Sequence, residues 1–118
     1  MLIRIKNLRL RTIIGLTDLE RKDRQDVVVN AEIEFDGAQA ARTDDIADGI
    51  NYRTITKRLI HEVEGSDWRL LEQLADHILT AIMDEERVRR ATVEVDKPHA
   101  LRFADSVSVV CSAERGKT

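Results

Sequence analysis

A strand and its stop signal stand together in Ala91-Thr92-Val93-Glu94-Val95-Asp96-Lys97-Pro98, which ends in the only proline of the chain. Apolar and polar residues alternate along this run, as they do in a half-buried strand. Proline cannot donate to a strand ladder, so the chain must leave the sheet here. The predicted strand, Thr92 to Lys97, therefore carries an ammonium group at its C-terminal end. That lysine is either a solvated strand end or a proton carrier, because a lysine pKa moves readily on partial desolvation.

Three further strands are predicted from the same alternation of apolar and polar residues. They are Leu2 to Gly15, Val27 to Phe35 and Ser106 to Ala113. The first strand breaks its period at Lys6-Asn7, which indicates a bulge. The segment Leu16 to Asp26 is highly charged and is expected to be a connection. The polar tail from Glu114 is expected to fray.

Helical spacing of apolar residues predicts two helices in the middle of the chain. The first is Tyr52 to Glu64, and the second runs from a cap at Ser66 or Asp67 to about Glu86. The order β-β-α-α-β-β favours an α+β fold, in which a four-stranded antiparallel sheet carries both helices on one face. The length fits a single domain over 1–118. Such a sheet keeps two open edges and a free face, which favours oligomerisation.

Composition and charge limit the classes of protein to which the chain can belong. Hydrophobic residues make up 42% of its 118 residues and charged residues 35%, as in a soluble globular protein. The net charge of -3 argues against a general nucleic-acid binder. No apolar run approaches the ~20 residues of a membrane span, and no signal-peptide block opens the chain. Because Cys111 is the lone cysteine, no internal disulfide can form, and we expect a cytoplasmic protein.

Three more side chains are candidates for a functional site. Glu72 lies near the start of the second predicted helix, where the dipole keeps a carboxylate ionised. Its two oxygens can accept parallel N–H donors from a planar heterocycle. Tyr52, the only tyrosine, could stack on a ring or donate a hydrogen bond. Glu20 taken alone is a solvated charge, and a plain surface position is the ordinary alternative for the other two.

The pattern of histidines gives little support to a metal site. His61, His77 and His99 form neither an i,i+4 pair nor a His-x-His element. The sequence also lacks a glycine-rich phosphate loop and a serine nucleophile elbow. We therefore expect neither a metal nor another cofactor.

Four separated elements resemble the dihydroneopterin aldolase family, within the tunnelling-fold (T-fold) pterin-binding proteins. They are Gly15-Leu16-Thr17-Asp18-Leu19-Glu20 with Gln25, Asn51-Tyr52, Leu70-Leu71-Glu72-Gln73-Leu74-Ala75 and Val95-Asp96-Lys97-Pro98. The resemblance covers about Ile3 to Ala113. It implies a barrel closed by several copies of the chain, commonly an octamer of two stacked tetrameric rings, with each site between subunits.

The resemblance implies a role for each candidate. Lys97 matches the lysine of proton transfer, and Tyr52 the tyrosine near the substrate side chain. Glu20 matches the glutamate that helps to orient substrate and water. Glu72 matches the glutamate that anchors the pterin ring, and Leu71 beside it belongs to the same substrate pocket.

Within the family, three segments look like the branch of dihydroneopterin triphosphate 2'-epimerases. They are Ile3 to Thr12, Asn51-Tyr52-Arg53-Thr54 and His99-Ala100-Leu101-Arg102-Phe103-Ala104-Asp105-Ser106-Val107-Ser108. This branch implies inversion of C2' of the substrate side chain by cleavage and re-formation of the C1'–C2' bond. The candidate partners for the triphosphate are Arg102, Arg53, Arg11 and Arg9, since guanidinium binds phosphate oxygens bidentately.

Three other functions stay open from the sequence. The nearest is a dihydroneopterin aldolase of folate synthesis, which releases glycolaldehyde and 6-hydroxymethyl-7,8-dihydropterin. Another is a different T-fold activity, such as a zinc-dependent pterin synthase or a GTP cyclohydrolase, although clustered His and Cys ligands are lacking. The last is a non-catalytic ring-forming module that has kept a pterin pocket.

Overall fold

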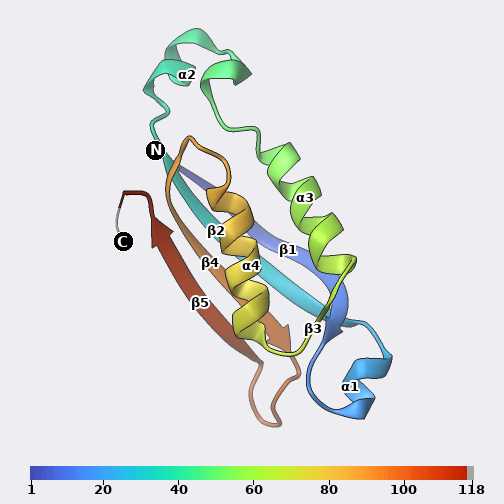
Figure 1. Cartoon of the computed structure of the whole chain (residues 1–118). Helices are drawn as coiled ribbons and strands as arrows, with labels where there is room; N and C mark the ends of the chain where they lie inside the picture. The colour runs from blue at the N-terminus through green and yellow to red at the C-terminus, as the bar shows by residue number, and fades with distance from the viewer. Residues whose placement is uncertain (117–118) are drawn as a thin grey trace.

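The computed structural model describes residues 1–116, in which two helices cover one face of a curved sheet (Figure 1). The molecule is elongated and measures 51 × 26 × 25 Å. The strands are β1 (Leu2–Ile14), β2 (Gln25–Phe35), β3 (Asp67–Trp68), β4 (Val88–Pro98) and β5 (Ser106–Glu114). The helical segments are α1 (Asp18–Lys22), α2 (Ala38–Thr43), the 3-10 turn η1 (Ile46–Asp48), α3 (Tyr52–Glu64) and α4 (Leu71–Met83).

The sheet has the strand order β3-β1-β2-β4-β5. Its four long strands are antiparallel, as the sequence predicts, and α3 and α4 lie on the same face (Figure 1). The structure adds the two-residue strand β3, which pairs in parallel with Ile13 and Ile14 at the end of β1. The predicted bulge in β1 is confirmed by a register shift between Ile5 and Leu8.

The second helix begins later and ends earlier than predicted. Asp67 pairs with β1 as part of β3, so it cannot cap a helix. The helix starts at Leu71 after the extended residue Leu70 and ends at Met83 instead of Glu86. Glu72 nevertheless lies in the first turn, as expected.

Two predicted irregular segments are ordered. The connection after Gly15 contains α1, which is closed by a capping box between Thr17 and Glu20. The predicted fraying from Glu114 is wrong for the described tail, because β5 includes Glu114 and the Arg115 N–H donates to Arg89 O at 2.7 Å. Residues 117 and 118 of the predicted tail lie outside the described residues.

The hydrophobic core lies between the sheet and the two long helices. Alternate residues of β2 and β4 face the helices, because side chains alternate between the faces of a strand. Full burial of each such side chain contributes about 1.5–3 kcal/mol. The completely buried apolar residues at this interface include Val27, Val29, Ile33, Leu59, Leu74, Ile78, Ile82, Val93 and Val95.

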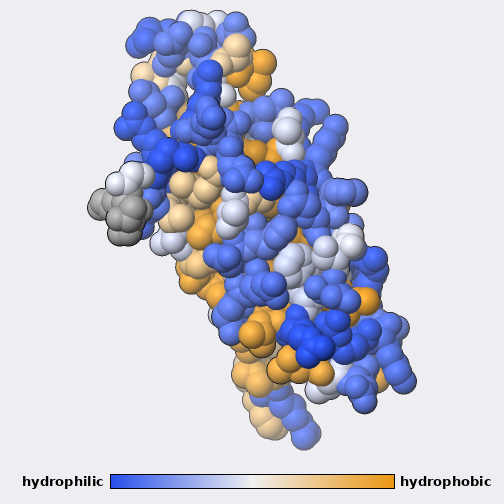
Figure 2. All heavy atoms as spheres, viewed as in Figure 1, coloured by the Kyte–Doolittle hydropathy of each residue, from blue (hydrophilic) through white to orange (hydrophobic). Residues whose placement is uncertain are grey.

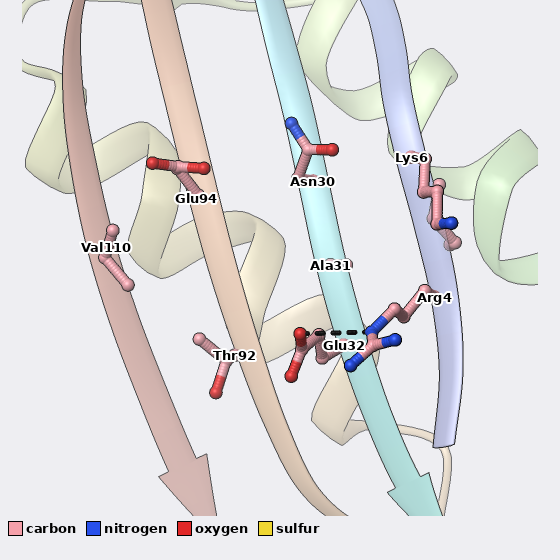
Figure 3. A pocket seen from close by; sticks show the side chains of 9 residues that line it. Arg4, Lys6, Asn30, Ala31, Glu32, Thr92, Glu94 and Val110 are labelled. Carbon is pink, nitrogen blue, oxygen red and sulfur yellow. Dashed lines mark hydrogen bonds and ion pairs between the residues drawn. The ribbon is translucent and has the colours of Figure 1, made fainter.

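The other face of the sheet is uncovered and polar. A shallow pocket of about 230 Å³ lies on it, across β1, β2, β4 and β5 (Figure 3). Arg4 and Glu32 form an ion pair of 3.2 Å at this pocket, with Glu94 and Val110 on the neighbouring strands. The predicted site residues of the described chain are not among those that line it.

Candidate active site

An ion pair joins the end of β4 to α1. The Lys97 ammonium contacts Glu20 Oε2, across 77 positions of sequence. The two side chains are only 12% and 30% exposed. The structure therefore brings together two of the residues predicted to carry the chemistry, in a place where water screens their charges only partly.

Glu20 is ionised throughout the physiological pH range. The hydrogen bond from Lys97 lowers the pKa of Glu20 from 4.5 to about 2, and burial opposes this shift only in part. The backbone N–H groups of Thr17 and Leu16 also favour the carboxylate, since they donate to Oε1 at 3.4 and 3.3 Å. The Lys97 side chain thus faces a carboxylate that stays charged at neutral pH.

The lowered pKa of Glu20 predicts how stability depends on pH. A carboxyl whose pKa falls on folding stabilises the folded protein above its unfolded pKa, and this contribution is lost as pH falls from about 4.5 to 2. We expect Glu20→Gln to be less stable than wild type at pH 6 and to approach it towards pH 3, in urea unfolding. Glu86→Gln, which removes an exposed carboxylate without an ion pair in the described chain, should run parallel to wild type. A Glu20→Gln deficit that does not change with pH would contradict the pairing.

Gly15 makes room for the Glu20 carboxylate. It has a φ of 138°, in a region that L side chains rarely adopt. A Cβ at this position would lie 2.5 and 2.6 Å from the two Glu20 carboxylate oxygens. A glycine is therefore needed between β1 and α1 if Glu20 is to reach Lys97.

We expect Gly15→Ala to separate Glu20 from Lys97. The strained backbone should cost about 1–3 kcal/mol of stability, measured by urea unfolding, and turnover should fall as the carboxylate is displaced. Gly49→Ala is the matched control, because a Cβ there would meet nothing closer than 3.6 Å at an extended φ of -118°. Wild-type turnover in folded Gly15→Ala would show that the Glu20 position is not needed.

Polar contacts to β3 hold α1 in place, since α1 has no buried residue. The Arg21 guanidinium donates to Trp68 O at 2.8 Å and pairs with Asp67 Oδ2 at 3.0 Å. The Gly15 N–H donates to the same Trp68 carbonyl at 3.0 Å. Trp68 is itself fixed, because its ring is buried and its Nε1–H donates to Val63 O at 3.1 Å. The sequence did not predict these contacts between α1 and β3.

Glu72 and Leu71 lie at the same end of the molecule as α1 and the end of β4 (Figure 1). Leu71 is half-buried against the core. Glu72 is exposed, and its carboxylate has no hydrogen-bond partner within residues 1–116. Both oxygens are therefore free to accept N–H donors from a ligand.

Tyr52 and Arg53 lie at the opposite end of the molecule, near α2 (Figure 1). Tyr52 is 53% exposed and lines a shallow hollow with Ile46 and Ile50. The 13 residues of α3, about 20 Å of helix, separate it from Glu64 at the far end. One chain therefore does not bring Tyr52 or Arg53 to Lys97, and a shared site requires a second copy.

Arg102 lies in the loop between β4 and β5, which begins two residues after Lys97. Its guanidinium carbon is 5.3 Å from the centroid of the Phe103 ring. Phe103 and Gly15 also belong to this end of the molecule, but neither was among the candidate site residues. The motif from Gly15 to Glu20 could have indicated the need for the glycine. Phe103 lies in the segment from His99 to Ser108, and nothing in the sequence assigned it a role.

No group of three or more His, Cys, Asp or Glu side chains within residues 1–116 is arranged to hold a metal ion. In the same part of the chain, none of the helices is long and apolar enough to cross a membrane. The candidate site consists of one partly buried ion pair, one free carboxylate and one guanidinium at the same end. Such a set can anchor a planar heterocycle and move a proton beside it.

Comparison with known proteins supports the family that the sequence motifs suggest. A profile of the family "Dihydroneopterin aldolase" matches residues 3–112. The dihydroneopterin triphosphate 2'-epimerase of Pseudomonas aeruginosa is 49% identical over 113 residues, which cover 96% of this chain and 92% of that protein. The dihydroneopterin aldolase of Escherichia coli strain K12 is 30% identical over 112 residues, which cover 95% and 90%.

A solved structure supports the fold. The crystal structure of Escherichia coli dihydroneopterin aldolase in complex with neopterin matches with a TM-score of 0.91 and 27% identity, over 96% of this chain and 98% of that chain. The α+β T-fold predicted from the sequence is thereby confirmed. With a family profile that spans almost the whole chain and a fold that superposes end to end, the chain belongs to the dihydroneopterin aldolase family.

Proposed function

We propose that this protein is a dihydroneopterin triphosphate 2'-epimerase, which inverts C2' of 7,8-dihydroneopterin triphosphate to give dihydromonapterin triphosphate. The observation that carries the proposal is the contrast in identity: 49% to an epimerase against 30% to an aldolase, over nearly the same span. The paired Lys97 and Glu20 and the free carboxylate of Glu72 supply the groups that the reaction needs.

The reaction requires an anchor for the ring and a carrier for one proton. Loss of the 2'-hydroxyl proton lets the C1'–C2' bond break, so that C2' becomes an aldehyde carbon. The electron pair left at C1' delocalises into the ring imine, and no Schiff base is required. When C1' attacks the other face of the aldehyde, the bond re-forms with inverted C2', and a proton returns to the oxygen.

Lys97 is proposed as the proton carrier and Glu72 as the anchor. The ammonium form of Lys97 can give a proton to the aldehyde oxygen as the bond re-forms, and the amine form can accept one from the hydroxyl. The contact with Glu20 holds the Lys97 side chain at the end of β4 for this exchange. Glu72, with Leu71 beside it, holds the ring through paired N–H donors.

Retention of the cleaved fragment separates an epimerase from an aldolase. An aldolase protonates C1' and releases glycolaldehyde, whereas an epimerase keeps the aldehyde until the bond has re-formed. A triphosphate gives the protein a handle on that fragment. Arg102 and Arg53 are the proposed partners of the phosphates.

We also propose a homo-octamer of two tetrameric rings in the cytoplasm. The outer edge of β5 is open, and β1 is paired on its outer side only over Ile13 and Ile14. Such edges pair with further strands. Tyr52 and Arg53 would reach the Lys97 site from a neighbouring copy. Light scattering on the eluting protein should give about 108 kDa, eight times 13.5 kDa, and a monomer mass would contradict the ring.

Product analysis tests the function directly. Dihydroneopterin triphosphate is incubated with the protein, dephosphorylated, oxidised and resolved on a chiral column. Monapterin as the main product supports the epimerase. Hydroxymethylpterin as the main product would make the protein an aldolase, and no conversion would leave a pterin-binding module without catalysis.

A further inference from the structure

The β4–β5 loop, residues 99–105, has a fixed base and a projecting tip. At the base, the His99 N–H donates to Asp105 O at 3.4 Å, and Ser106 Oγ lies 3.0 Å from Asp96 Oδ1. The loop extends beyond the sheet at the lower end of the molecule (Figure 1). The base of the loop is thus tied to the strand that carries Lys97.

The tip exposes an aromatic ring that lies outside the hydrophobic core. Phe103 is 98% exposed, and its φ of 69° is unusual for a bulky residue. Figure 2 shows apolar side chains, among blue ones, gathered at this lower end of the molecule. An exposed ring on a residue with an unusual backbone conformation contributes little to the stability of the chain. Its contacts at the tip therefore indicate its function.

The Phe103 ring holds an otherwise unpaired guanidinium. The Arg102 guanidinium lies over the ring at 5.3 Å from its centroid. Within residues 1–116, Arg102 makes no ion pair. Arg21, on the neighbouring α1, differs because its guanidinium already contacts Asp67 and Trp68 O. Arg102 therefore keeps its N–H donors available at this end of the molecule.

We propose that Phe103 is a positioning residue that holds the Arg102 guanidinium for the phosphate chain of the substrate, so that the pair retains the cleaved aldehyde fragment. This inference rests on the proposed epimerase function. A guanidinium stacked on a ring keeps its planar fork of donors free for phosphate oxygens. Fixing the side chain beforehand also reduces the conformational entropy that binding must remove.

The chemistry explains why retention would be placed there. After cleavage, the aldehyde carbon must turn its other face to C1' while the fragment stays in the site. A grip on the phosphates leaves the C2'–C3' end free to rotate. A grip on the aldehyde oxygen alone would hold the face that must change. Arg102, five residues beyond Lys97, is suited to hold the end of the fragment away from the reacting bond.

Two substitutions at Phe103 separate a stacking role from an apolar contact. Phe103→Leu keeps an apolar side chain but removes the ring face, whereas Phe103→Trp keeps the ring face. We expect Phe103→Leu to raise KM for dihydroneopterin triphosphate by about twofold to thirtyfold and to shift products towards hydroxymethylpterin. Phe103→Trp should retain the wild-type KM and product ratio, and KM for unphosphorylated dihydroneopterin should not change in either variant.

A double-mutant cycle and a control within the loop complete the test. Arg102→Ala should raise KM at least as much as Phe103→Leu, because it removes the phosphate contact itself, and the double variant should be no worse than Arg102→Ala. Leu101→Ala alters another exposed apolar side chain of the loop, 58% exposed, and should behave as wild type. Additive effects would overturn the inference, as would equal defects in Phe103→Leu and Phe103→Trp with loss of the oligomer mass.

The proposed function and this inference can fail separately. The wild-type product ratio reports the function, since hydroxymethylpterin as the main product would remove the epimerase. The contrast between the Phe103 variants reports the inference, since a wild-type enzyme that makes monapterin with an unaffected Phe103→Leu variant would remove only the positioning role.

Discussion

Replacing Lys97 with alanine is expected to lower kcat by about 10²–10⁴-fold while pterin affinity stays within about threefold of wild type. The expected loss is the contribution of a positioned proton carrier, and Lys97 is the ammonium that contacts Glu20 at the end of β4. Affinity should survive because Glu72, the proposed anchor of the ring, lies on another element. Turnover is measured by product analysis, and affinity by fluorescence titration with neopterin.

Lys97→Arg distinguishes charge from proton transfer at the same position. Arginine keeps a cation beside Glu20 but does not give up its proton in proteins. We expect it to preserve stability while turnover stays as low as in Lys97→Ala. A fully active Lys97→Arg would show that only the positive charge is required, and near-normal turnover of Lys97→Ala would exclude Lys97 altogether.

Replacing Glu72 with glutamine is expected to weaken pterin binding by about tenfold to a hundredfold. Hydrogen bonds to a charged group contribute about 1.5–3 kcal/mol, and glutamine substitutes an N–H donor where the ring needs an acceptor. Stability should change little, because Glu72 is exposed and unpaired within residues 1–116. Isothermal titration with neopterin measures the affinity.

The matched control for Glu72 is Glu86→Gln. Glu86 is also exposed, but it follows α4 at the end away from Lys97. It should bind pterin as wild type does. Unchanged affinity in a folded Glu72→Gln protein would remove the anchor role, whereas an equal loss in both variants would point to the net charge of the surface.

The long strands and the long helices were predictable because apolar residues recur in each of them at the spacing typical of a strand or a helix. Val93 and Val95 alternate with polar residues up to Pro98, and the structure ends β4 at that proline. β3 was not predictable, since two residues carry no period. The same short strand moved the start of α4 to Leu71, because Asp67 forms a strand pair instead of a cap.

The candidate site was only partly accessible to reasoning from spacing. Glu20 and Lys97 are far apart in sequence, so their contact is a product of the fold, and Glu20 became a candidate only through the family resemblance. The need for Gly15 follows from a collision that only coordinates reveal. Tyr52 lies at the far end of α3, so its predicted place beside Lys97 remains a prediction about the assembled protein.

The absence of buried side chains in α1 has a consequence for motion. Segments with few buried apolar contacts open locally at a lower free energy than global unfolding requires. We therefore expect α1 to detach from β3, with loss of the contact between Glu20 and Lys97, while the sheet and its two long helices stay folded. Amide hydrogens of α1 should exchange with solvent much faster than those of β2. The carboxylate that pairs with Lys97 thus lies on a segment that we expect to open before the sheet does.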